Sequence, residues 1–183
     1  MFIKIKDLEL RNLEFDESLA PGVIDLGEDQ IQTAPLKTSG RAELIREDRG
    51  GRNIVEDIRF VGSLSTEVQV RCARCLDPVD NVVAEKFDLL YRPLGVDAKG
   101  DEVAISEAET EIGYYQGDGM LLEDVLKEQI LLALPAKQLC QANCKGLCPQ
   151  CGKNLNLESC DCVITMPDPR WSALEDIRKK LER

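Results

Sequence analysis

Residues 139–162 read LCQANCKGLCPQCGKNLNLESCDC and hold six of the eight cysteines of the chain. The centre of this stretch is C-P-Q-C-G at 148–152, where two cysteines separated by two residues lie on a predicted tight turn. Pro149 fixes one backbone angle, and Gly152 permits the conformation that closes the turn around a cation. A C-D-C pair follows after a short loop, so four sulfurs can converge on one ion. The predicted ligands of this first site are Cys148, Cys151, Cys160 and Cys162.

Two further pairs of cysteines lie outside that set. One pair belongs to R-C-A-R-C-L-D-P at 71–78, and the other opens the cysteine-rich stretch. Together they could form a second four-thiolate site that links the first half of the chain to its tail. The three-residue gap in the later pair suits ligation, but it equally suits two ordinary cysteines on one face of a helical turn. The possible ligands of this second site are Cys72, Cys75, Cys140 and Cys144.

The metal predicted for these thiolates is structural zinc. The chain contains no histidine, so a zinc site here would be all-thiolate and coordinatively closed, whereas catalytic zinc keeps a position open for water. Iron is a minor alternative, because C-P-x-C-G also occurs in rubredoxin-like sites. Thiol redox chemistry is a weaker rival, since neither C-x-x-C pair is followed by an apolar helix whose dipole could lower a thiol pKa.

Composition indicates an ordinary globular protein of the cytoplasm. Hydrophobic residues make up 43% and charged residues 31% of the 183 positions, and no segment is apolar enough for a signal peptide or a membrane span. Cytosolic thiols stay reduced, which favours metal ligation over disulfides. The net charge of -11 divides into -12 for residues 1–138 and +1 for the tail. A chain this acidic should bind RNA locally rather than indiscriminately.

The first half of the chain is predicted to be mainly β. Residues 63–72 alternate apolar and polar side chains, and residues 86–93 alternate again, so two strands should flank the first cysteine pair as a hairpin-like unit. Residues 96–119 are rich in Asp, Glu and Gly, which suits a solvated loop with room for one short strand. Further partner strands are predicted at residues 3–10, 42–45 and 54–61.

Two helices complete the predicted fold. An apolar stripe after Gly119 has helical spacing, with acidic residues in its first turn and Pro135 at its end, and it should pack on the sheet. Asp168 and Pro169 open a second, C-terminal helix. The fold class is therefore α+β, with a mainly antiparallel β N-terminal half, one central helix, a small cysteine-rich zinc module and a C-terminal helix. The predicted divisions are 1–118, 119–138 and 139–183.

The order of motifs resembles the YceD family, bacterial and plastid proteins associated with accumulation of large-subunit ribosomal RNA. The resemblance rests on C-A-R-C-L-D-P at 72–78, K-G-L-C-P-Q-C-G-K-N-L-N at 145–156, C-D-C at 160–162 and D-P-R-W at 168–171. It implies a non-enzymatic cytoplasmic factor that supports 23S rRNA synthesis, processing or accumulation. No general base, phosphate-cradling glycine loop or open metal position suggests an enzyme or a small-molecule substrate.

The implied partner is large-subunit ribosomal RNA or a ribosomal protein, with no role at a membrane. Basic and amide side chains beside the cysteines are the candidate RNA contacts, because zinc knuckles are known RNA-reading modules. The same cations would equally offset the charge of the thiolates. An alternative function is an acidic adaptor that binds a ribosomal protein. The candidate RNA contacts are Arg71, Arg74, Lys145, Lys153 and Asn154.

Overall fold

The computed structural model describes residues 1–50, 54–96 and 112–162, and within them the chain is mainly β-sheet with two short helices. The elements in chain order are β1 (Phe2–Lys4), α1 (Ile5–Leu8), β2 (Leu13–Leu19), β3 (Gln30–Gln32), β4 (Leu36–Asp48), β5 (Ile54–Arg71), β6 (Pro78–Pro93), β7 (Ile112–Tyr115), β8 (Gly119–Leu121) and α2 (Leu122–Ala133). Neither helix is long and apolar enough to cross a membrane.

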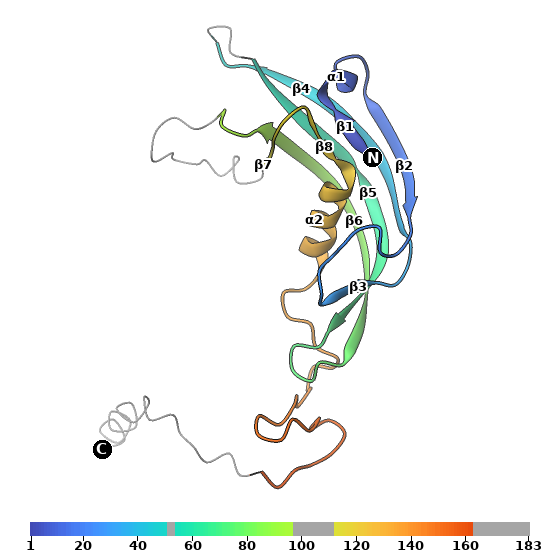
Figure 1. Cartoon of the computed structure of the whole chain (residues 1–183), viewed down its shortest axis with the longest axis vertical. Helices are drawn as coiled ribbons and strands as arrows, with labels where there is room; N and C mark the ends of the chain where they lie inside the picture. The colour runs from blue at the N-terminus through green and yellow to red at the C-terminus, as the bar shows by residue number, and fades with distance from the viewer. Residues whose placement is uncertain (51–53, 97–111, 163–183) are drawn as a thin grey trace, which may run out of the picture.

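A six-stranded sheet forms the body of the molecule, in the order β2-β4-β5-β6-β7, with β3 added to β5 (Figure 1). β5 is its centre, because it pairs along its length with β4 on one side and β6 on the other. These pairings are antiparallel, whereas β7 runs parallel to β6. β1 and β8 form a separate two-stranded sheet, which ties the N-terminus to the segment just before α2.

Period-two alternation places one face of β5 in the core. Ile58, Phe60, Leu64 and Val68 are all 3% exposed or less. α2 packs against this face and contributes Leu122, Val125, Leu126 and Ile130 to the same cluster. Phe60 meets Tyr91 of β6 edge-on at 5.8 Å between ring centroids. The Tyr91 hydroxyl donates to Glu128 of α2 at 2.7 Å, so a polar contact also joins helix to sheet.

Two glycines interrupt the core face at the middle of the sheet. Gly40 of β4 lies opposite Gly62 of β5, and the same row continues to Phe15 on β2 and Phe87 on β6. Both phenylalanines are buried, and their rings lie over the glycine positions. A Cβ on Gly62 would stand 2.6 Å from the Ser39 carbonyl oxygen. The strands therefore approach closely only because both positions lack a side chain.

Gly62→Ala should consequently destabilise the sheet by about 1–3 kcal/mol, the usual cost of overpacking a well-packed site. Ser65→Ala, on the exposed face of the same strand, is the matched control and should stay within about 0.5 kcal/mol of the parent. Urea unfolding measures both values. Equal stability of the two variants would show that the sheet can relax around a methyl group at this position.

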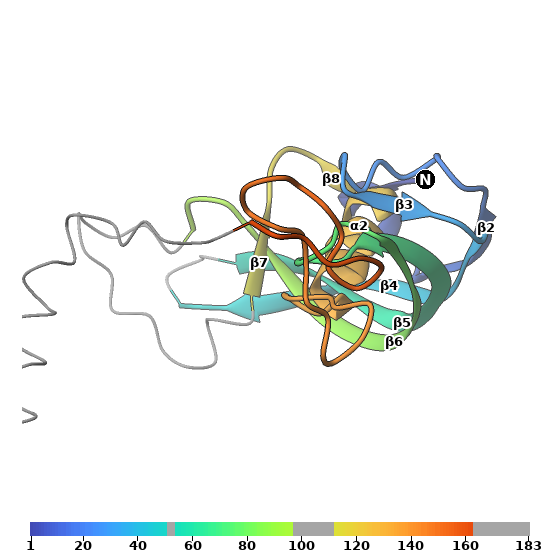
Figure 2. The same ribbon diagram turned by 90° about the horizontal axis from the view of Figure 1, so that it is seen from below.

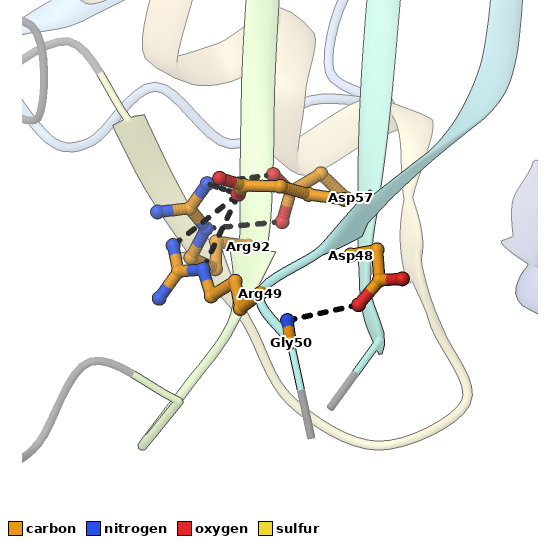
Figure 3. A network of polar contacts seen from close by, with 6 residues as sticks. Asp48, Arg49, Gly50, Asp57 and Arg92 are labelled. Atoms are coloured by element: carbon orange, nitrogen blue, oxygen red, sulfur yellow. Dashed lines mark hydrogen bonds and ion pairs between the residues drawn. The ribbon is translucent and has the colours of Figure 1, made fainter. Parts of the chain in front are cut away.

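A buried ion pair lies on β5 and β6 towards the end of the sheet that bears β7 (Figure 3). Arg92 donates to the two carboxylate oxygens of Asp57 at 3.1 and 2.9 Å, and the two residues are 5% and 2% exposed. Arg92 also contacts Glu47 at 3.0 Å, and Arg49 contacts the same carboxylate at 3.3 Å. The charges are thus shared among several partners rather than left isolated, as burial requires.

Several predicted boundaries need correction. Beyond Lys4 the prediction of a strand over residues 3–10 is wrong, since α1 follows; Ile5 and Leu8 are three residues apart, a spacing that also suits one helical turn. Residues 54–61 are not a separate partner strand, because Gly62 continues the backbone without a turn and β5 is one strand of 18 residues.

The segment from 119 to 138 differs in detail from its prediction. Gly119–Leu121 form β8, and the helix is confined to Leu122–Ala133, with Leu134 already extended before Pro135. Of the predicted apolar stripe, Leu121 and Leu131 are exposed. The predicted C-terminal helix lies outside the described residues, and so does the D-P-R-W motif at 168–171.

Candidate metal centres

The eight cysteines form two groups of four that could each hold a metal ion, and within each group all sulfurs lie within 4.8 Å of one another. We name the groups by position. The knuckle cluster consists of Cys72, Cys75, Cys140 and Cys144, and the tail cluster of Cys148, Cys151, Cys160 and Cys162. These are the two sets that the sequence predicts. Figure 1 places the cysteine-rich segment, in orange and red, beyond the β5–β6 hairpin, and Figure 2 views the molecule from that end.

The turn between β5 and β6 positions the first two cysteines of the knuckle cluster. The Cys72 N–H donates to the Asp77 carbonyl at 2.8 Å, and the Leu76 N–H donates to the Cys72 carbonyl at 3.0 Å. Leu76 has a φ of 64°, a left-handed conformation that reverses the chain immediately after Cys75. Cys72 and Cys75 are buried at 0% and 3% exposure, so both sulfurs are held on the inside of the turn.

The chain after α2 returns to this turn and supplies the other two sulfurs. The Ala73 N–H donates to the Gln138 carbonyl at 2.8 Å, and the Cys140 N–H points at the Cys72 sulfur at 3.4 Å. The sulfurs of Cys75 and Cys140 are then 3.5 Å apart, and those of Cys72 and Cys144 are 3.8 Å apart. Residues more than sixty positions apart are thereby joined at one point.

The tail cluster is built on a second tight turn. The Gly152 N–H donates to the Cys148 carbonyl at 2.9 Å, and the Cys148 N–H donates to the Lys153 carbonyl at 2.8 Å. Gly152 has a φ of 72°, which agrees with the permissive role predicted for it. A single antiparallel bridge between Leu147 and Asn154 closes the base of the turn. Cys148 is buried, whereas Cys151 is exposed.

Backbone amides and burial divide the thiols into two kinds. The N–H of Cys75 lowers the pKa of the Cys72 thiol to about 6, and the N–H of Cys151 does the same for the Cys148 thiol. Burial raises the pKa of the Cys75 thiol well above its usual range. Hydrogen bonding to Cys151 raises the pKa of the Cys162 thiol to about 12. Each cluster therefore pairs a readily ionised sulfur with one whose ionisation needs a nearby cation.

The sulfur geometry fits a tetrahedral ion better than covalent cross-links. A tetrahedral site with Zn–S bonds of about 2.3 Å spaces its sulfurs about 3.8 Å apart. The distances of 3.5 and 3.8 Å in the knuckle cluster are close to that spacing and far from the about 2.05 Å of a disulfide. All eight cysteines are free. Four converging sulfurs would fill the coordination sphere of such an ion without a position for water.

The five candidate RNA contacts surround the clusters but differ in their surroundings. Arg74 donates from Nη1 to the Cys144 carbonyl at 2.7 Å, and Lys153 forms an exposed ion pair with Glu158 at 3.1 Å. Asn154 donates to the Asp77 carboxylate at 3.0 Å. These three side chains therefore have structural contacts of their own. The side chains of Arg71 and Lys145 are exposed to solvent.

Sequence reasoning assigned no role to Asn156, which lies in the loop between Cys151 and Cys160. Its Nδ2 donates to the Cys144 sulfur at 3.3 Å and lowers the pKa of that thiol. The only local signal was the alternation N-L-N within 154–156, which reads like any polar loop. The contact spans the two clusters and was not accessible from spacing alone.

Comparison with known proteins agrees with the motif order. The sequence model described as "Large ribosomal RNA subunit accumulation protein YceD" matches residues 60–178. The chain therefore belongs to the YceD family, whose matched region contains both cysteine clusters. No solved structure matches the chain.

Relatives occur in bacteria and plants. An uncharacterized protein of Mycobacterium tuberculosis is 31% identical over 144 residues, covering 74% of this chain and 66% of the relative. The protein YlbN of Bacillus subtilis is 25% identical over 179 residues, covering 97% and 94%. An Arabidopsis thaliana protein named "Large ribosomal RNA subunit accumulation protein YCED homolog 1, chloroplastic" is 29% identical over 147 residues, covering 69% and 46%. The chain thus spans just under two thirds of the mycobacterial relative.

Proposed function

We propose that this protein is a non-enzymatic cytoplasmic factor that supports 23S rRNA synthesis, processing or accumulation during large-subunit biogenesis, with a structural zinc ion in each cysteine cluster. The observation that carries the proposal is the pair of four-sulfur clusters inside the region matched by the YceD family. Family membership implies a role in accumulation of large-subunit ribosomal RNA. The two four-sulfur clusters are suited to hold segments of the chain together, as structural zinc sites do.

A scaffold role follows from the coordination that the clusters can provide. Zinc with four thiolates has no position for a water nucleophile, and the chain has no histidine to act as a general base. Such an ion holds polypeptide in place instead of activating a substrate. The knuckle cluster would fasten the chain after α2 to the β5–β6 turn, and the tail cluster would then fold residues 148–162 onto it.

Charge suggests where a partner binds. Residues 1–138 carry a net charge of -12, whereas the tail from 139 carries +1 before the negative charge of the thiolates is counted, so phosphate contact at the cysteine-rich end would depend on individual basic side chains. The exposed Arg71 and Lys145 lie at that end. Local contact with one RNA element is therefore the primary proposal. The second candidate, an acidic adaptor that binds a basic ribosomal protein, is favoured by the charge of the body.

Two measurements test the primary proposal. Elemental analysis of freshly purified protein should give two zinc ions per chain and no iron. Depletion of the protein in cells should lower large-subunit rRNA relative to small-subunit rRNA. Equal levels of the two rRNAs after depletion would contradict the proposed role, and a red, iron-containing protein would contradict the zinc assignment.

Lysine substitutions separate RNA contact from protein contact. Lys145→Ala combined with Lys153→Ala should weaken crosslinking to rRNA while zinc content stays at two ions. Lys37→Ala combined with Lys86→Ala removes the same charge from exposed sheet positions and serves as the control. Unchanged crosslinking in the first variant would exclude these lysines as contacts. Co-purification with a ribosomal protein after nuclease treatment would instead support the adaptor.

A further inference from the structure

One side chain joins the two clusters. Asn156 belongs to the tail loop, the segment 152–159 between the cysteine pairs of the tail cluster, yet its Nδ2 donates to Sγ of Cys144 in the knuckle cluster at 3.3 Å. Its Oδ1 accepts from the Lys145 backbone N–H at 2.8 Å. The tail loop thus supplies a hydrogen-bond donor to a sulfur that it does not itself carry.

The hydrogen-bonding capacity of Asn156 is fully used. An amide side chain offers two N–H donors and one oxygen with two lone pairs. The second donor goes to Oδ1 of Asn154 at 2.9 Å, and the second lone pair accepts from Gln141 Nε2 at 3.2 Å. The side chain is therefore held in one orientation, with its donor directed at the thiol. A fixed donor of this kind stabilises a thiolate more than solvent would.

Asn154 extends the connection to the other half of the knuckle cluster. Its Nδ2 donates to the Asp77 carboxylate at 3.0 Å, and its Oδ1 accepts from the Asn156 backbone N–H at 3.0 Å. The carbonyl of Asp77 in turn accepts from the N–H of Cys72. The tail loop thereby contacts both segments that supply the knuckle sulfurs.

The backbone between the clusters is also tightly constrained. The Leu147 N–H donates to the Arg74 carbonyl at 3.0 Å, and the Leu155 N–H donates to the Gly146 carbonyl at 2.9 Å. Gly146 has a φ of 79°, and a Cβ there would stand 3.0 Å from the Arg74 carbonyl oxygen. Movement of the tail loop would therefore be transmitted to the β5–β6 turn through these backbone hydrogen bonds.

From these contacts we infer that Asn156 is a positioning residue that couples the two metal sites, so that an ion in the tail cluster raises the affinity of the knuckle cluster. This inference rests on the proposal that both clusters hold zinc. An ion in the tail cluster closes the tail loop, and the closed loop orients the Asn156 amide towards the Cys144 thiolate. By thermodynamic reciprocity, an ion in the knuckle cluster raises the affinity of the tail cluster by the same factor.

Substitution of Asn156 in the zinc-loaded full chain tests the coupling. Asn156→Ala should weaken zinc binding at the knuckle cluster about 10- to 100-fold, the usual effect of removing an outer-sphere partner. Competition with a chelator of known affinity measures the change, and alkylation of released thiols with mass spectrometry assigns each ion to its cluster. Leu157→Ala, in the same loop at a side chain that is 82% exposed, should leave both sites unchanged.

Asn156→Asp distinguishes a donor to sulfur from a merely structural acceptor. Aspartate has nearly the same shape and still accepts from the Lys145 N–H, but it cannot donate to Cys144 and places a negative charge beside the thiolates. We expect it to weaken the knuckle site at least as much as alanine does. Recovery of parent affinity in this variant would overturn the inference.

A double-mutant cycle completes the test. Cys151→Ser with Cys162→Ser removes the tail site and should weaken the knuckle site by a similar factor, after which Asn156→Ala should add less than about twofold. Fully additive effects would overturn the coupling. If the parent chain binds two zinc ions and Asn156→Ala leaves the zinc affinity of the knuckle cluster unchanged, the coupling alone is overturned. If the purified parent chain contains no zinc, the proposed function is overturned as well.

Discussion

Removal of metal by a strong chelator is expected to unfold residues 139–162 and loosen the β5–β6 turn, while the rest of the six-stranded sheet stays folded. The main hydrophobic cluster reaches no further along the described chain than Leu134. Among residues 1–50, 54–96 and 112–162, the partly buried apolar side chains packed against the knuckle cluster are those of Val79, Leu139 and Leu147. Structural zinc supplies roughly 10–16 kcal/mol of apparent binding energy in small finger peptides, and nothing comparable is available here from apolar burial.

Limited proteolysis and hydrogen exchange measure this effect. Chelation should raise cleavage within 139–162 at least about tenfold, and exchange protection should fall at Cys72 while it persists at core positions such as Phe60. Cys148→Ser should reproduce the tail cleavage without chelator. Ser159→Ala, which changes no sulfur, is the control. Protection that is equal with and without metal would mean that the segment is held by its hydrogen bonds alone.

Asp57→Ala is expected to destabilise the sheet by about 3–5 kcal/mol, the usual cost of removing one partner from a buried ion pair. The carboxylate is 2% exposed and accepts two hydrogen bonds from Arg92. Removal of the Asp57 carboxylate leaves the Arg92 guanidinium, which is 5% exposed, with Glu47 and the remaining contacts of Arg92 to balance its charge. The penalty is mainly the cost of keeping this guanidinium buried after its most buried partner has been removed.

Asp88→Ala is the matched control for that experiment. Asp88 also forms a two-point contact with an arginine, Arg59, at 2.7 and 2.6 Å, but the pair lies on the exposed face of the sheet. Solvent screens this pair, so its loss should cost less than about 1 kcal/mol. Urea unfolding compares the two variants. A cost for Asp57→Ala no greater than that for Asp88→Ala would show that water reaches Arg92 once the carboxylate is gone.

The parts of the fold that follow a local period were predictable from the sequence. Alternation over residues 63–72 and 86–93 identified the paired β5 and β6, because one face of each strand is buried against α2. Glycine at 62 concealed the continuity of β5: glycine often marks a turn, but here it marks a close approach of two strands. Parallel pairing of β7 had no local signal, since it depends on a partner distant in the sequence.

The cysteine groups were predictable for a different reason. Thiols in C-x-x-C and C-x-C spacing have little freedom, so the tail cluster was predictable from spacing. The knuckle cluster was one of two interpretations left open, because three residues separate Cys140 from Cys144. The surroundings of the sulfurs were not predictable. Asn154 is predicted as a candidate RNA contact, and the sequence carries no signal for the hydrogen bonds that its side chain forms with Asp77 and Asn156. Polar loop residues carry no period, so only the folded chain shows which of them face inward.

The long separation between the halves of the knuckle cluster has a consequence for synthesis. Cys75 and Cys140 are 65 positions apart in the sequence, so an ion bound in the knuckle cluster would close a loop of chain that contains β6, β7, β8 and α2. During translation the sheet and α2 emerge first, and the fourth sulfur leaves the ribosome only after they can pair. The knuckle cluster would then bind its metal late in synthesis, because only a nascent chain whose sheet has already formed brings all four sulfurs together.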